Sequence, residues 1–156
     1  MELFKRTAAV DVCHIPYKGA APAVNDLISG QVNVVFADVG TVLPYVKAGK
    51  AKALGISSLR RFEGLPDIPT ISEAGVPGFE GGGFIGLAAP AGTPRAAIVA
   101  LNAAANKSLA VPEVRKRLIE LATFPIGGSP EQFDQHLRAE IEKWARVIRA
   151  GNIRAD

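Results

Sequence analysis

The sequence predicts an α/β domain, in which a parallel sheet carries helices on both faces. Short runs of β-branched residues alternate with helical segments through residues 12–56. This β-α-β-α-β order is typical of a parallel, two-sided sheet. Hydrophobic residues make up 48% of the 156 positions and charged residues 21%, so the chain can bury a core and a disordered chain is excluded. Apolar residues also recur at helical spacing in the last part of the sequence, where we expect amphipathic helices.

Helices and strands alternate in the first part of the chain. Residues 3–9 are typical of the end of a helix; strands are expected at 12–15, 32–36 and 53–56, and helices at 20–28 and 41–48. Pro22 is tolerated in the first turn of its helix, and Gly30 and Gly49 end the two helices. The β-branched run at 32–36 is typical of a buried strand.

A long connection rich in proline and glycine follows at residues 57–82, and this composition is typical of loops. Thr70 and Glu73 have the spacing of a capping box, which predicts a single helical turn there. A further strand is expected at residues 83–89.

The next helical segment should begin near Thr93, which is expected to cap a helix over residues 94–110 with Pro94 at its first position. A second helix is expected to restart at Pro112 and to run to Leu121. It should be followed by an edge strand at residues 124–126.

The terminal helix is predicted over residues 129–150. Ser129 and Gln132 form a second capping box, which is a typical start signal. One apolar face of this helix is formed by Phe133, Leu137, Ile141, Trp144 and Ile148. Such a stripe predicts burial against a partner surface.

The composition argues against several classes of protein. The chain has 18 Lys and Arg, 15 Asp and Glu and only 6% aromatic residues; with its basic residues spread along the chain, nucleic-acid binding is not expected. The single cysteine, Cys13, excludes an internal disulfide, and two histidines leave little for a metal site. No apolar run approaches the roughly 18 residues of a membrane span. We expect neither a metal nor another cofactor.

Two sequence features could suggest an enzyme, but the elements expected around them argue against that interpretation. Cys13 and His14 are adjacent on an expected strand, where successive side chains face opposite ways, so they cannot form a nucleophile–base pair. Residues 81–86 match the G-x-G-x-x-G pattern, but a dinucleotide site needs this pattern to open a helix, and here a strand is expected to follow. The sequence therefore does not predict an enzyme.

The loops that follow the first two expected strands are the candidate binding site. Residues 17–21 lie between a strand and a helix, and free N–H groups at a helix N-terminus bind anions. The small residues Gly19, Ala20 and Ala21 would let a carboxylate approach those groups. Residues 37–41 should open at the same carboxyl edge of the sheet, where open α/β sheets bind ligands. The alternative is that both loops are ordinary strand-to-helix turns.

A series of motifs resembles one family of receptors in type and in order. The segment from His14 to Ala23, with Asp26-Leu27 and Gly30-Gln31-Val32 after it, resembles the signature of the tripartite tricarboxylate transporter substrate-binding receptors, also known as Bug or TctC-like proteins. The further matching motifs are Leu43-Pro44, Lys47-Ala48-Gly49-Lys50, Leu65-Pro66-Asp67-Ile68-Pro69-Thr70, Glu73-Ala74-Gly75, Pro77-Gly78-Phe79-Glu80 and Ala89-Pro90-Ala91-Gly92-Thr93-Pro94. The resemblance runs from Leu3 to Ala155.

The resemblance implies a longer, two-lobed receptor with the type II periplasmic-binding fold, of which this chain is expected to be the C-terminal half. Residues 1–80 would form most of the second, ligand-binding lobe, and residues 81–92 a crossover and hinge strand. Residues 93–156 would supply C-terminal helices that pack on the first lobe. The expected α/β fold, a parallel sheet with flanking helices, is therefore incomplete. The sequence shows no signal peptide, so a periplasmic location is implied by the resemblance alone.

The resemblance also implies the function of a solute receptor that binds a small carboxylate and delivers it to a membrane permease. Carried over by motif, the main-chain amides of Gly19, Ala20 and Ala21 would hold the distal carboxylate, in a loop that also contains Tyr17 and Lys18.

The turn after the second expected strand, with Ala37, Asp38 and Val39, would contact the middle of the ligand. Many family members carry Asp or Asn at the position of Ala37, so an amine-recognising role is not carried over to Asp38. Two alternatives to the receptor stay open. One is a ligand-free remnant that mainly self-associates, as a homodimer, through its helical stripes; the other, less favoured, is an α/β enzyme.

Overall fold

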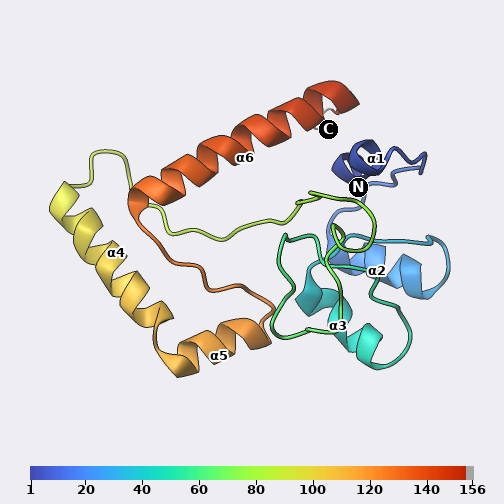
Figure 1. Cartoon of the computed structure of the whole chain (residues 1–156), viewed down its shortest axis with the longest axis horizontal. Coiled ribbons are helices and arrows are strands. Elements are labelled where there is room, and N and C mark those ends of the chain that lie inside the picture. Colours follow the sequence, from blue (N-terminus) through green and yellow to red (C-terminus); the bar gives the residue numbers. More distant parts are fainter. Residues whose placement is uncertain (154–156) are drawn as a thin grey trace. The chain divides into compact units, whose positions relative to one another are not determined.

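The structure is a computed structural model that describes residues 1–153 (Figure 1). It divides into two compact units. The N-terminal unit runs from Met1 to Gly82, and the C-terminal unit begins at Gly83. None of the helices among the described residues is long and apolar enough to cross a membrane.

The N-terminal unit contains three helices. They are α1 (Glu2–Ala8), α2 (Ala20–Ile28) and α3 (Val39–Lys47). All three confirm helices expected from the sequence, although α3 begins two residues before the predicted start because Asp38 takes the N-cap position. Helices α2 and α3 pack against each other, and Ala23 and Val24 of α2 are buried.

The predicted parallel sheet is not found among residues 1–153. None of the segments 12–15, 32–36 and 53–56 forms a strand, and the one β-bridge of the described residues is a parallel pair between Ile56 and Thr70. This unit is therefore a set of helices and irregular segments, and the prediction of a sheet within it is wrong.

The backbone hydrogen bonds give the physical reason. A β-branched run favours an extended backbone, but a strand forms only where a neighbouring strand accepts its N–H groups. The N–H of Val32 instead donates to the carbonyl of Asp26 on α2, at 3.4 Å. Ile56 pairs with the connection, since its N–H donates to the Pro69 carbonyl and its carbonyl accepts from the Ile71 N–H, both at 2.9 Å.

The capping box predicted within the connection is confirmed. The N–H of Glu73 donates to Thr70 Oγ1 at 3.0 Å, and the N–H of Thr70 donates to Glu73 Oε2 at 2.9 Å. The single helical turn follows from the bond between the Ala74 N–H and the Thr70 carbonyl, at 2.9 Å. Thr70 is fully buried, with 1% of its surface exposed.

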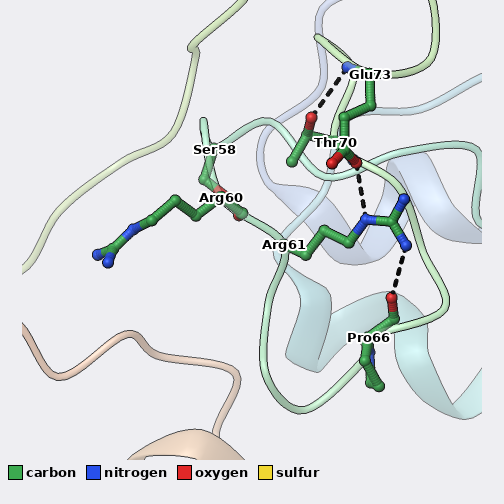
Figure 2. Close-up of polar contacts among 6 residues, drawn as sticks. All are labelled: Ser58, Arg60, Arg61, Pro66, Thr70 and Glu73. Carbon is green, nitrogen blue, oxygen red and sulfur yellow. Dashed lines mark hydrogen bonds and ion pairs between the residues drawn. The ribbon is translucent and has the colours of Figure 1, made fainter.

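An arginine completes this box, and we call the set of Arg61, Thr70 and Glu73 the clamp. Arg61 Nε donates to Glu73 Oε2 at 2.8 Å, and Arg61 Nη1 donates to the Pro66 carbonyl at 3.0 Å. Figure 2 shows Arg61 reaching between these two acceptors, while the neighbouring Arg60 points away. The clamp therefore holds both ends of the 61–73 segment together.

The clamp predicts an acid-sensitive contribution to stability. The pKa of Glu73 lies below its ordinary value of 4.5, first because the Thr70 N–H donates to the carboxylate and then because Arg61 does. A lowered pKa in the folded state gives stability that is complete above the unfolded pKa and is lost as the pH falls through the folded pKa. We therefore expect Glu73→Gln, which keeps an amide oxygen for capping, to flatten the fall in melting temperature below about pH 4.5.

Thermal melts of wild type and Glu73→Gln between neutral and acidic pH measure this effect. Glu80→Gln is the matched control, because Glu80 is an exposed glutamate of the same unit outside the clamp. Equal acid sensitivity in wild type and Glu73→Gln would show that the clamp contributes nothing through its charge.

Three phenylalanines form an aromatic cluster in the N-terminal unit. The ring of Phe4 on α1 lies 5.6 Å from that of Phe36 and 5.8 Å from that of Phe79, and the Phe36 and Phe79 rings are 6.3 Å apart. Phe79 is 3% exposed. A Cβ on Gly81 would lie 3.1 Å from the Phe79 ring. Through this cluster, α1 contacts Phe36, which precedes the 37–41 loop, and Phe79, which lies near the end of the 57–82 connection.

The described part of the C-terminal unit, residues 83–153, contains three further helices. They are α4 (Arg95–Leu109), α5 (Pro112–Glu120) and α6 (Pro130–Gly151). The start of α5 at Pro112 is as predicted. The expected cap at Thr93 is wrong, because α4 begins at Arg95 and the Thr93 hydroxyl donates to the Pro90 carbonyl, at 2.8 Å, instead of capping the helix.

The second capping box is confirmed at the start of α6. The N–H of Gln132 donates to Ser129 Oγ at 3.2 Å, and the N–H of Ser129 donates to Gln132 Oε1 at 2.8 Å. The preceding glycine is tied to α4, since the Gly128 N–H donates to Asn106 Oδ1 and the Gly128 carbonyl accepts from Asn106 Nδ2, both at 2.9 Å.

The segments predicted as strands at 83–89 and 124–126 are irregular. The first of them contacts α6, since the Phe84 ring lies 5.8 Å from the Phe133 ring and 5.0 Å from the His136 ring. A Cβ on Gly86 would lie 2.2 Å from Phe133, so glycine is required for this approach. Packing on a helix, in place of strand pairing, explains why the predicted strand does not form.

Candidate functional site

The 17–21 loop leads directly into α2. Gly19 is the N-cap, with φ 132° and ψ 174°, and no side chain accepts a hydrogen bond from the first turn of the helix. The first N–H groups of a helix have no partner within the helix. Gly19 and Ala21 are exposed, and no heavy atom lies within 4 Å of the place where a Gly19 Cβ would stand. The loop therefore has main-chain donors that no side chain caps, at the positive end of the helix dipole.

Tyr17 occupies this loop in a different way from its neighbours. Its hydroxyl donates to Asp26 Oδ2 at 2.6 Å, so its polar end is turned to α2. The pKa of Tyr17 is raised, first by this hydrogen bond, then by desolvation and by the charge of Asp26. Lys18 is exposed. The hydroxyl of Tyr17 is thus engaged within the chain, whereas the residues from Lys18 to Ala21 form the open part of the loop.

The 37–41 loop leads into α3 in the same manner. Asp38 is the N-cap, and its carbonyl accepts from the Thr41 N–H at 2.9 Å, but its side chain makes no capping bond. The Asp38 side chain is exposed, and Ala37 and Val39 are half-buried. The preceding Phe36 belongs to the aromatic cluster, which fixes the start of the loop.

All of the predicted site residues thus lie at the N-termini of two helices that pack against each other in one unit. Sequence reasoning missed Asp26 as the partner of Tyr17. The two residues are nine positions apart. In a regular helix or strand, residues at this spacing lie on opposite faces. The packing of the loop onto α2 is what brings them together.

The structure adds nothing that would favour metal or nucleotide chemistry. Within residues 1–153, no three side chains of His, Cys, Asp or Glu lie where they could hold a metal ion. Cys13 is exposed, and the neighbouring His14 has its Nδ1 3.4 Å from Glu2 Oε1. The glycines at 81–86 open no helix, because the next helix begins at Arg95.

Comparisons with known proteins give one consistent family. The family model described as "Tripartite tricarboxylate transporter family receptor" matches residues 1–153. A protein from Pseudomonas sp. strain P51, named "UPF0065 protein in tcbD-tcbE intergenic region", is 40% identical over 147 residues, which are 94% of this chain and 44% of that protein.

Two solved structures match nearly the whole chain. The structure described as "R. palustris Rpa4515 with adipate" has a TM-score of 0.82 and 35% identity, and the match covers 97% of this chain and 51% of that one. The structure of "MatC (Rpa3494) from Rhodopseudomonas palustris with bound malate" has a TM-score of 0.68 and 36% identity, covering 94% and 51%. The chain thus spans about half the length of these proteins, and it shares the fold of that half.

Proposed function

Because the chain belongs to the tripartite tricarboxylate transporter receptor family, we propose that it binds a small dicarboxylate at the N-terminus of α2. Members of this family are solute-binding receptors and not enzymes. The observation that carries the proposal is the uncapped start of α2, where Gly19, Ala20 and Ala21 leave their main-chain N–H groups without a side-chain partner. Such a helix start receives a carboxylate through hydrogen bonds and through the helix dipole.

The class of ligand is supported by the solved structures. Rpa4515 is seen with adipate and MatC with malate, and both ligands are dicarboxylates of modest size. We assign one carboxylate to the 17–21 loop, where Lys18 adds a positive charge nearby. The 37–41 loop, with Ala37, Asp38 and Val39, faces the middle of the ligand in this proposal. The exposed Asp38 carboxylate would disfavour a further negative charge on that part of the ligand.

The place of the chain in transport is proposed from the family. A receptor of this kind collects its ligand in the periplasm and passes it to the membrane permease of the transporter. The chain would supply the ligand-binding loops from residues 1–80, the hinge segment from residues 81–92 and the packing helices from residue 93 onward.

Calorimetric titration of the chain with adipate and with malate tests the proposal. We expect binding of at least one of the two, with selective chemical-shift changes at the amides of Gly19, Ala20 and Ala21. Dimethyl adipate is the matched control ligand, because it keeps the carbon chain but lacks both negative charges. Binding of the diester as tightly as of adipate, or shifts confined to the C-terminal unit, would contradict the site.

A second candidate function is self-association. Along α6, Ile141 is 60% exposed and Ile148 is 47% exposed, and Val99 on α4 is 57% exposed. Apolar side chains in such numbers on helical faces favour a homodimer. A chain that takes up none of the three ligands, while its mass by light scattering rises with concentration, would support this candidate in place of the receptor.

A further inference from the structure

A side-chain hydrogen bond between Tyr17 and Asp26 ties the 17–21 loop to α2. The donor and acceptor oxygens are 2.6 Å apart, which is the length of a charge-assisted bond from a hydroxyl to a carboxylate. The Tyr17 hydroxyl is the donor, and this hydrogen bond is the first cause of the raised pKa of Tyr17. Both side chains are partly buried, and water competes less for this bond than for an exposed one.

Asp26 also anchors the segment that leaves α2. Its main-chain carbonyl accepts from the Gln31 N–H at 2.8 Å and from the Ser29 hydroxyl at 3.3 Å. The Asp26 side chain therefore holds the 17–21 loop before α2, and the Asp26 carbonyl holds residues 29–31 after it. The second of these segments continues through Phe36 to the 37–41 loop.

The loop has little else to define its shape. Among the described residues, no other side-chain hydrogen bond of the structure ties residues 17–21 to α2. Gly19 has no heavy atom near its missing side chain, and a glycine at φ 132° is free to adopt other conformations. The Tyr17 bond is therefore the side-chain hydrogen bond through which α2 can fix the conformation of this loop.

We propose that Tyr17 and Asp26 form a positioning latch, which holds the 17–21 loop in the conformation that receives a carboxylate. This inference rests on the proposed function of the same loop. It assigns Tyr17 a role through the loop and not through direct contact with the ligand. When the latch is removed, the competent conformation is populated for only part of the time, and the affinity falls by the same fraction.

The test is a double-mutant cycle of Tyr17→Phe and Asp26→Leu, measured by calorimetric titration with adipate and malate. We expect each single variant to lose about tenfold in affinity, as for one hydrogen bond to a charged group. The double variant should lose no more than either single variant, because both changes break the same bond. Asp26→Asn keeps an acceptor for the hydroxyl and should recover most of the affinity. Tyr45→Phe is the matched control, since Tyr45 is the second of the two tyrosines and lies on α3.

A second measurement needs no ligand. Backbone amide order parameters at residues 18–21, measured by NMR relaxation, should fall in Tyr17→Phe and stay unchanged in Tyr45→Phe. Unchanged order parameters in Tyr17→Phe, or additive losses of affinity in the cycle, would overturn the latch. If the wild-type chain takes up neither dicarboxylate, the proposed function fails for this chain, and the order parameters still decide whether the latch holds the loop.

Discussion

Phe79→Ala is expected to lower the free energy of unfolding of the N-terminal unit by about 3–5 kcal/mol, the range for buried phenylalanine truncations. Phe79 is 3% exposed, and its ring contacts those of Phe4 and Phe36. Truncation leaves a cavity between α1 and the residue that precedes the 37–41 loop. Because a small domain has only about 5–15 kcal/mol of stability in total, this loss is large. Denaturant unfolding followed by circular dichroism measures it.

Phe84→Ala is the matched control for this variant. Phe84 is 45% exposed and belongs to the C-terminal unit, so the same truncation should cost only about 1 kcal/mol there. Equal losses in the two variants, or a loss below about 1 kcal/mol for Phe79→Ala, would mean that the aromatic cluster is not the core of its unit.

Gly19→Pro is expected to weaken dicarboxylate binding by about 10- to 100-fold, as for the loss of one hydrogen bond to a charged group. Proline has no N–H to donate, and its ring holds φ near about −65°, whereas Gly19 has φ 132°. The substitution therefore removes a donor and also turns the adjacent amides away from the ligand. Calorimetric titration with adipate measures the loss.

Gly49→Pro is the control that distinguishes a loss of affinity at the 17–21 loop from a general effect of backbone strain. Gly49 also has a positive φ, of 68°, with no heavy atom near its missing side chain, but it follows α3 at the end opposite to the 37–41 loop. We expect Gly49→Pro to lower the melting temperature and to leave the affinity of the folded chain unchanged. If Gly19→Pro binds like wild type, or if both variants lose affinity equally, the 17–21 loop is not the site.

Local signals in the sequence were enough to predict the helices of this chain. The run from Ala20 to Ile28 has its boundaries where expected, and the capping boxes at Thr70 and Ser129 form with both reciprocal bonds. A cap or an apolar stripe involves residues three or four positions apart, so the information lies within a short window. A local signal can still fail. Thr93 was predicted to cap α4, but its hydroxyl donates to the Pro90 carbonyl instead.

Pairing between distant segments could not be predicted in this way. The β-branched run at 32–36 indicates an extended backbone but does not indicate which segment would pair with it. The bridge that does form joins Ile56 to Thr70 of the connection. The candidate site follows the same division. Its residues lie at helix starts, as their local sequence indicates, but the bond from Tyr17 to Asp26 depends on how the loop folds back onto α2.

The close approach of Gly86 to Phe133 has a consequence for how this sequence can diverge. A side chain at position 86 would occupy the space that the ring of Phe133 takes, and one at position 81 would press on the ring of Phe79. Neighbouring aromatic rings, and not a phosphate, thus account for two of the three glycines of the nucleotide-binding pattern, Gly81 and Gly86. A larger residue at position 86 would need a smaller one at position 133, so we expect these two positions to change as a pair.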